Sequence, residues 1–521
     1  MPIARITPLS GINKDLSATE LPIGYVTDAN NVRFREGYAE PFLGHTAAYP
    51  VSGGPIPVAP YSAFPIRLPS GVYWIVAGAN KVYAVTGTPA VWTDITRTTG
   101  GDYAATLDIR WNGGILSGVP ILNNGVDIPQ MWNPVDVATK LTALANWPAN
   151  DRALVMRPWR FNMVALNMTV GGVRRPYRLK ISGPADPGSV PASWDETSLT
   201  SNVYLQDLDG AGNIVDGLTM REAFIIYREN STYKVTFTGG DALYSVQPLF
   251  TTSGILARDC VVEVDGSHFV LTNTDLIVHD GNSLKSVLDK GSRRTLFQTM
   301  SPEFRQTRCF LVKNIYFNEV WVCYPSLEST GACDRALVYN YKDNTISFRD
   351  IPQAVSGNTG QVDDSINEQW DSDQQEWDQD NSAWNEIEFG AQQERTLLSV
   401  PSRPGLALID SGTLFFDQLA NPRLERQGLA LDAPELVKTV TRIRPRVSGP
   451  TGTVIMIRAM GSMTPTGAVE VKPWVPYTIG TQQTVDLFAT GKFITWQAQS
   501  FVSANWRIEG LDIEFRTRGG F

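Results

Sequence analysis

Short apolar runs separated by turn residues recur along most of this 521-residue chain, and this pattern most limits what it can fold into. We find no long amphipathic stretch with apolar positions at i, i+3, i+4 and i+7, so few helices are expected. Paired runs broken by Gly, Asn, Asp or Pro are instead typical of β-hairpins. The chain is therefore predicted to be all-β, with hairpins at 72–87, 114–132, 161–182, 223–240, 268–287, 314–325 with 336–352, and 396–412.

Most of these hairpins start ~40–60 residues apart, a spacing typical of propeller blades. Within them, Glu229-Asn230-Ser231 and Asp280-Gly281 predict tight turns between strands. The 44 glycines, 33 prolines and hydrophobic fraction of 42% agree with many strands around a packed core. Two packed sandwiches would give a similar pattern. We favour a β-propeller of six or seven blades.

Two segments flank this predicted propeller body, which spans 51–435. Residues 1–50 are rich in turn residues and are expected to form a mostly irregular N-terminal assembly arm, anchored by Val32, Phe34, Tyr38 and Phe42. Residues 436–521 carry a separate β pattern and predict a C-terminal β-sandwich-like domain. Its last strand is outlined by apolar residues with an irregularity near Gly510: Trp506, Ile508, Leu511, Ile513 and Phe515.

An acidic, tryptophan-rich insertion is predicted near 353–395. Between Arg349 and Arg395 there are 12 Asp and Glu and no Lys or Arg, whereas the whole chain has a net charge of −9. We interpret the window as a surface excursion that contacts DNA in a channel or a partner protein. Its candidate contact acids are Asp371, Asp373, Glu376, Asp378, Asp380, Glu386 and Glu388, and its aromatic anchors are Trp370, Trp377 and Trp384.

A basic strand is predicted at 441–447, where Arg442, Arg444 and Arg446 alternate and so share one strand face. One alternative is a strand face that is simply exposed to solvent. The functional interpretation is a charged contact with a neighbouring subunit that presents acids.

The motifs of the common enzyme classes are missing. We find no phosphate-binding loop, no HExxH and no GxSxG, and only 3 histidines. The 4 cysteines lack metal-type spacing and are predicted to be unpaired. No catalytic residue, cofactor, metal site or membrane insertion is therefore predicted. The segment "MPIARITPLSG" has no apolar signal-peptide core, so the chain is expected to be made in a cytoplasm.

Several stretches resemble one family. The segment "GINKDLSATELPIGYVTDANNVRFREGYAEPFLGH" (11–45) resembles the N-termini of tail proteins from short-tailed bacteriophages. Similar stretches are "FIIYRENSTYKV" (224–235), 253–281, 336–352, the repeated WD of the acidic window and "ITWQAQSFVSANWRIEGLDIEF" (494–515). The resemblance therefore covers most of the chain in pieces.

The resemblance implies a tail nozzle, or packaged-DNA stabilisation protein, of the podovirus type. Such a protein is a β-propeller that forms a hexameric ring below the phage portal and adaptor and lines the DNA exit channel. It carries tail fibres or spikes, touches genomic DNA only transiently, and is a structural component of the virion without catalytic residues. Its production is expected in the cytoplasm of the bacterial host.

Two other functions stay open at this point. The chain could be a fibre- or receptor-docking protein on the tail exterior, which would present aromatic clusters at one rim. It could also be a propeller glycan hydrolase, which would need two carboxylates across a pocket.

Overall fold

The computed structural model describes residues 2–52, 54–68, 71–87, 89–198, 200–240, 243–362, 394–403, 405–431, 433–465, 467 and 469–519. In these residues strands dominate, and the helices are α1 (Lys290–Thr299) and α2 (Arg305–Arg308). None of the helices in these ranges has the length and apolar character needed to span a membrane. The prediction of an all-β chain is confirmed.

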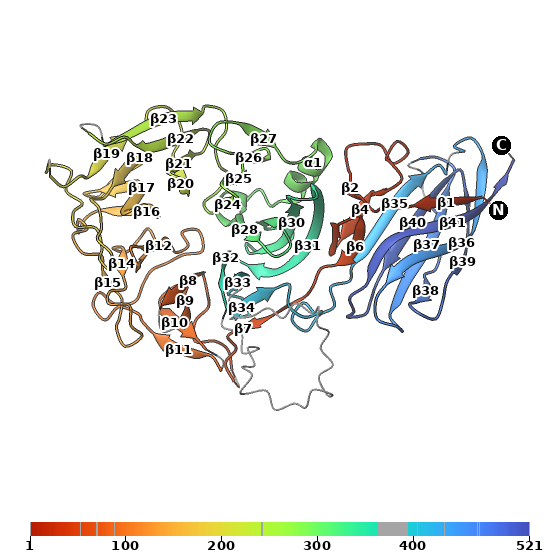
Figure 1. The fold of residues 1–521 in the computed structure, drawn as a ribbon, viewed down its shortest axis with the longest axis horizontal. Helices are drawn as coiled ribbons and strands as arrows, with labels where there is room; N and C mark the ends of the chain where they lie inside the picture. The colour runs from red at the N-terminus through yellow and green to blue at the C-terminus, as the bar shows by residue number, and fades with distance from the viewer. Residues whose placement is uncertain are drawn as a thin grey trace.

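Seven four-stranded antiparallel sheets make up the larger part of the molecule (Figure 1). The first three consist of β8 (Ser62–Leu68), β9 (Gly71–Ala77), β10 (Val82–Thr86) and β11 (Val91–Asp94); β12 (Asn112–Leu116), β13 (Val119–Asn123), β14 (Gln130–Met131) and β15 (Thr142–Ala143); and β16 (Arg152–Trp159), β17 (Asn162–Val170), β18 (Val173–Ile181) and β19 (Tyr204–Asp207).

The fourth to sixth sheets follow in chain order. They consist of β20 (Ile214–Met220), β21 (Ala223–Arg228), β22 (Thr232–Phe237) and β23 (Tyr244–Phe250); β24 (Val261–Val264), β25 (Ser267–Leu271), β26 (Leu276–His279) and β27 (Leu284–Ser286); and β28 (Phe310–Asn314), β29 (Glu319–Tyr324), β30 (Cys333–Asn340) and β31 (Thr345–Ala354).

The seventh sheet combines both ends of the propeller. Its strands are β32 (Ser356–Gln361), β33 (Glu394–Val400), β34 (Gly405–Ile409) and, at the outer edge, β7 (His45–Ala48). The first strand of each sheet contacts the first strand of the next, and β32 contacts β8. The seven sheets therefore form a closed ring, which excludes the alternative of two packed sandwiches.

Each predicted hairpin is present in the structure, and two of the predicted turns show how their residues favour it. The turn at 229–231 joins β21 to β22. At the next predicted turn, between β26 and β27, Asp280 accepts hydrogen bonds from the backbone N–H groups of Asn282 and Ser283, and Gly281 has a φ of 86°. Asp and Gly meet the needs of such a turn with little strain.

A two-sheet sandwich lies beside the propeller, at the right of Figure 1. One sheet contains β39 (Val485–Gly491), β36 (Val437–Ser448), β41 (Arg507–Arg518), β6 (Tyr38–Pro41), β5 (Val32–Arg35) and β1 (Ile3–Ile6). The other contains β38 (Val475–Thr478), β37 (Val454–Ser462), β40 (Phe493–Gln499), β35 (Arg423–Leu429) and β4 (Asp28–Asn30). A short parallel pair, β2 (Gly11–Ile12) and β3 (Tyr25–Val26), completes the fold.

The predicted last strand is confirmed in detail as β41. Ile508, Leu511 and Ile513 are buried in the sandwich core, and the register against β36 shifts beside Gly510. A Cβ at Gly510 would lie 2.1 Å from the carbonyl oxygen of Ile6, so only glycine allows β1 to approach there.

The prediction that residues 1–50 form a mostly irregular arm is wrong. Residues 3–41 supply four strands of the sandwich, and β7 closes the propeller, so the N-terminal 50 residues are built into both bodies. The predicted boundary at 436 also differs, since the sandwich already includes β35. These strands have three or four residues each, and all except β5 pair with strands more than 350 residues away, as in Ile6↔Leu511. Such short segments cannot display a period-2 pattern.

All four cysteines are free and buried: Cys260, Cys309, Cys323 and Cys333. Burial raises the pKa of each thiol, which suppresses the reactive thiolate. We expect a thiol reagent such as DTNB to label none of the four in the native protein and all of them in denaturant. Fast labelling of a native thiol would contradict the buried positions, and a thiol still blocked in denaturant would contradict the absence of disulfides.

Candidate functional site

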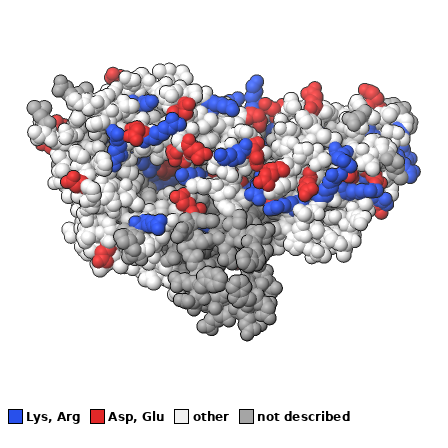
Figure 2. Space-filling view, viewed as in Figure 1, with Lys and Arg blue, Asp and Glu red and all other residues white. Residues whose placement is uncertain are grey.

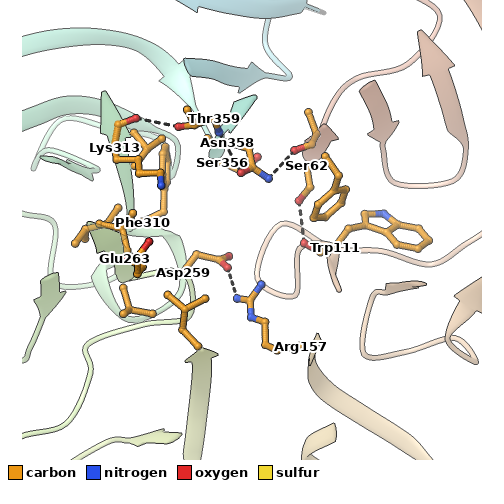
Figure 3. A pocket seen from close by; sticks show the side chains of 18 residues that line it. Ser62, Trp111, Arg157, Asp259, Glu263, Phe310, Lys313, Ser356, Asn358 and Thr359 are labelled. Atoms are coloured by element: carbon orange, nitrogen blue, oxygen red, sulfur yellow. Dashed lines mark hydrogen bonds and ion pairs between the residues drawn. The ribbon is translucent and has the colours of Figure 1, made fainter. Parts of the chain in front are cut away.

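The first strands of six of the seven sheets, with Trp111 just before β12, line a cavity of about 370 Å³ at the centre of the propeller (Figure 3). Its wall is part apolar, from Phe64, Trp111 and Phe310, and part polar. The close-up shows Ser62 and Asn358 on one side and Arg157 and Asp259 on another; the polar lining residues are Ser62, Arg157, Asp259, Glu263, Lys313, Ser356, Asn358 and Thr359.

Two of the polar lining residues, Arg157 and Asp259, belong to a cluster with Asp216 and Arg110. Arg157, at the end of β16, donates to both oxygens of Asp216 on β20, at 3.0 and 2.9 Å. It also donates to Asp259 at 2.7 Å, while Arg110 lies 3.4 Å from the other oxygen of Asp259. The backbone N–H of Asp259 donates to Asp216 at 2.8 Å. The cluster thus joins residues in, or just before, the first strands of four consecutive sheets.

The electrostatics of the cluster are set by the arginines. Burial alone would raise the pKa of Asp259, but Arg157, Arg258 and Arg110 together hold that pKa well below its ordinary value. Asp259 also has a φ of 63°, in the left-handed region that asparagine and aspartate tolerate better than most residues. Asp259 is therefore a fixed anion that cannot act as a general acid near neutral pH.

Several other polar groups of the cavity also have partners within the protein, whereas the buried hydroxyl of Ser356 has none among the described residues. Glu263 accepts a hydrogen bond from the N–H of Gly266 at 2.7 Å, and Asn358 donates to the carbonyl of Ala63 at 3.2 Å. Thr359 donates to the carbonyl of Lys313 at 2.9 Å. In the described part of the chain no group of His, Cys, Asp and Glu is arranged to hold a metal ion. The geometry is that of polar groups bridging sheets.

The depressed pKa of Asp259 predicts a specific acid response. A carboxyl whose pKa is lower in the folded state contributes stability that is present above the unfolded pKa of about 3.9 and is lost as pH falls below it. Asp259→Asn should therefore show a smaller drop in Tm between pH 5 and pH 3 than the unmodified chain, measured by calorimetry.

Three buried histidines set the background of that measurement. Burial lowers the pKa of His45 to about 3 and those of His268 and His279 to about 4, so their loss of stability begins near pH 6.5 in both proteins. Asp486→Asn, at an exposed partner of Arg442, serves as the control and should leave the drop in Tm unchanged. Equal drops in all three proteins would contradict the assignment to Asp259.

A second buried cluster lies where the propeller meets the sandwich. Arg33 on β5 donates to Glu319 at 2.5 and 3.1 Å and to Asp410 at 2.8 Å. Asp410 also accepts from Arg349 at 3.2 Å and from Asn314 at 2.6 Å. We call Arg33, Glu319, Arg349 and Asp410 the joint cluster. All four are at least nine-tenths buried.

An aromatic ring completes the joint. The ring centroid of Phe42 lies 4.6 Å from Cζ of Arg33 and 4.5 Å from Cζ of Arg349. Trp321 donates to Glu319 at 2.9 Å. Desolvated cation–π and ion-pair contacts of this kind are strong and geometrically specific. The joint therefore holds residues 33–42 firmly against the sixth and seventh sheets.

The predicted acidic surface is only partly described. Asp371, Asp373, Glu376, Asp378, Asp380, Glu386 and Glu388, with Trp370, Trp377 and Trp384, lie outside the described residues. The flanking strands are β32 and β33, which are neighbours in the seventh sheet. The predicted insertion therefore joins two strands of one sheet.

The predicted basic strand is β36, and its arginines have partners within the sandwich sheet. Arg442 lies 2.7 Å from Asp486, Arg444 2.5 Å from Glu514 and Arg446 3.1 Å from Asp512. The acids belong to β39 and β41, on either side. Figure 2 shows basic and acidic side chains intermixed over this face of the molecule. A contact of this strand with another subunit remains a prediction, made by arginines that are already partly neutralised.

Sequence reasoning missed both ion clusters. Their members are single residues in separate hairpins, with no spacing that marks them. Two of the segments that resemble phage tail proteins do contain cluster members and could have drawn attention to them. Segment 11–45 contains Arg33, and segment 253–281 contains Asp259.

No protein-family model and no curated protein matches the chain. Similar solved structures include PorZ of the type-IX secretion system of Porphyromonas gingivalis, at 9% identity and a TM-score of 0.35, with 75% of this chain and 43% of that one covered.

The extracellular domain of the one-component system BT4673 from B. thetaiotaomicron has 9% identity and a TM-score of 0.39, with 89% and 58% covered. The exo-β-1,3-galactanase of Phanerochaete chrysosporium has 10% identity and a TM-score of 0.28, with 91% and 99% covered. The chain thus spans less than two thirds of the first two structures. At these values the likenesses carry no functional argument.

Proposed function

We propose that this chain is a structural subunit of the tail of a short-tailed bacteriophage: a ring-forming nozzle that connects to the portal and adaptor, lines the DNA exit channel and retains the packaged genome. The observation that carries the proposal is the position of residues 11–45. The segment on which the resemblance rests contains Arg33 and Phe42 and forms the joint between propeller and sandwich.

A rigid joint is what a ring subunit needs. Each subunit in a closed ring contacts its two neighbours through different surfaces, and the angle between those surfaces decides whether the ring closes. The joint cluster ties the sandwich strand β5 to Glu319 and Asp410 of the propeller through buried ion pairs. Buried pairs have a demanding geometry, so they suit a fixed angle better than a hinge.

The central cavity supports a structural role over a hydrolase. A glycosidase needs a carboxylic acid that is protonated near neutral pH, facing a second carboxylate. Asp259 has a lowered pKa, and Asp216 is fully buried and bonded to Arg157 by two hydrogen bonds. A cavity of about 370 Å³ is also too small for a DNA duplex, because a duplex is wider than its major groove, which alone measures about 12 Å. In this proposal the genome passes through the channel that the ring of subunits encloses.

The mass of the particle in solution tests the proposal. We expect the purified chain to form a hexamer, alone or on addition of a phage portal–adaptor complex, when measured by light scattering and native mass spectrometry. A monomer that never binds the portal complex would overturn the ring. Binding to fibres without ring closure would favour the exterior docking protein, and hydrolysis of a glycan would favour the enzyme.

The acidic insertion offers a second test. Replacing Asp371, Asp373, Asp378 and Asp380 with Asn should leave Tm nearly unchanged, because twelve acids without a base cannot attract one another. If the insertion faces the DNA, genome ejection should slow most at low salt, where attraction to phosphates is least screened. If it faces outward, ejection should be normal and the attachment of fibres or subunits should weaken. A large fall in Tm without either effect would contradict both interpretations.

A further inference from the structure

A second cavity, of about 560 Å³, opens near the starts of several inner strands of the propeller. Its lining comes from five of the seven sheets or the loops before them. We call it the amide cavity, because five amide side chains surround it: Asn167, Asn213, Asn230, Asn273 and Gln306. Ile109, Leu154 and Val215 add an apolar wall. Hydrogen-bonding amides beside an apolar patch are typical of small-molecule sites.

Arg258 lines this cavity and is an unusual residue in it. Its side chain is only 8% exposed, and two of its nitrogens, Nε and Nη2, are buried without a hydrogen-bond acceptor in the described chain. Its nearest carboxylate, Asp259, is 3.5 Å away. A buried guanidinium normally makes several hydrogen bonds. Burying one without them costs folding free energy unless another group, such as a ligand, accepts those bonds.

The neighbouring acids do not supply that group. Asp259 already accepts from Arg157 at 2.7 Å, and Asp216 is held by the same arginine. Three arginines, Arg110, Arg157 and Arg258, therefore share two aspartates, which leaves one buried positive charge. Because Arg258 is the arginine that borders the amide cavity, an anion bound there would balance this charge.

The other charges of the lining offset one another. Asp108 is paired with Arg308 at 3.0 Å, and the exposed Arg174 balances Glu229, which accepts from Asn213 at 2.8 Å. The charge left to balance is that of Arg258 alone, and a carboxylate, with one negative charge, matches its planar guanidinium better than a doubly charged phosphate. Asn230 and Gln306 are exposed and make no side-chain hydrogen bond to other described residues, so they remain available to hydroxyl groups.

We propose that the amide cavity binds a carboxylated sugar, with its carboxylate on Arg258, its hydroxyls on the amides and its C–H face on the apolar wall. This site is independent of ring formation. The volume of about 560 Å³ suits one or two sugar rings, within the usual range for ligand pockets.

Two probes that differ only in the carboxylate test the site. Methyl β-D-glucuronide and methyl β-D-glucoside are titrated into the full chain by calorimetry and saturation-transfer NMR, beside inorganic phosphate. We expect the glucuronide to bind at least tenfold more tightly than the glucoside or phosphate. Equal binding of glucuronide and glucoside, tighter binding of phosphate, or no binding of glucuronide at millimolar concentration would each overturn the proposal.

Variants locate the interaction. Arg258→Gln should weaken glucuronide binding at least tenfold, and Arg258→Lys should weaken it less, since lysine keeps the charge but loses the planar fork. Arg160→Gln, at a partly exposed arginine paired with Glu222 in another cavity, is the matched control and should bind normally. Unchanged binding by Arg258→Gln would overturn the site.

A variant at an exposed residue keeps the test possible if the first variant misfolds. If Arg258→Gln does not fold, Asn230→Ala remains available, because its side chain is exposed and bonds to no other described residue. It should bind glucuronide more weakly with an unchanged Tm. Normal binding by this variant and by Arg174→Gln, at the second arginine of the cavity, would overturn the proposal without need of the first variant.

Discussion

The Asp410→Asn variant is expected to lose about 3–5 kcal/mol of unfolding free energy, because it breaks a buried ion-pair network from one side. Asp410 accepts hydrogen bonds from Arg33, Arg349 and Asn314, and both arginines are almost fully buried. Without the carboxylate charge, two guanidiniums share only Glu319. The loss is measured by urea unfolding with tryptophan fluorescence, since Trp321 lies in the cluster.

An exposed ion pair provides the matched control. Asp417 lies 3.6 Å from Arg403 and its side chain is 89% exposed, so Asp417→Asn should change the unfolding free energy by less than about 1 kcal/mol. If the two variants lose equal stability, the joint cluster contributes no more than a surface pair. The cluster would then not fix the angle between propeller and sandwich.

Removal of residues 1–35 is expected to abolish folding of the sandwich. The deletion takes away β1, β4 and β5, which leaves β41 without one neighbour and β35 without its edge partner. It also removes Ile6, Val32 and Phe34 from the core. We expect low soluble yield, or a protein whose residues 423–518 are cut rapidly by protease while the propeller resists.

Two substitutions on one strand test whether the effect of the deletion comes from lost core packing. Ile6 is fully buried and Ile3 is 52% exposed, both on β1. Ile6→Ala should cost about 2–5 kcal/mol, as for other buried isoleucines, and Ile3→Ala should cost less than about 1 kcal/mol. A truncated chain that folds and assembles normally would show that the N-terminal strands are dispensable.

The fold was predictable where the information is local. The hairpins β21–β22 and β26–β27 follow from alternating apolar runs and from turn residues such as Asp280 and Gly281, which act within a few positions. The register shift at Gly510 could be predicted for the same reason. By contrast, the pairing of Ile6 with Leu511 depends on chain closure over the whole length, which no local pattern encodes.

The candidate sites were less predictable than the fold. Asp216 and Asp259 look like ordinary turn or strand acids until Arg157 is brought beside them by the ring of sheets. Arg258 is notable only because it lacks partners, and a missing contact leaves no mark in a sequence. The arginines of β36 were found because alternation is a local signal, but their acidic partners come from other strands.

The order in which the strands pair has a consequence for synthesis on the ribosome. The propeller cannot close until β34 has emerged to meet β7, and the first sandwich sheet cannot form until β41 has emerged to meet β1 and β6. A nascent chain stopped before residue 507 therefore lacks the central strand of that sheet. Incomplete products would expose unfolded segments to proteases, so only a chain that has been translated past β41 reaches the folded state.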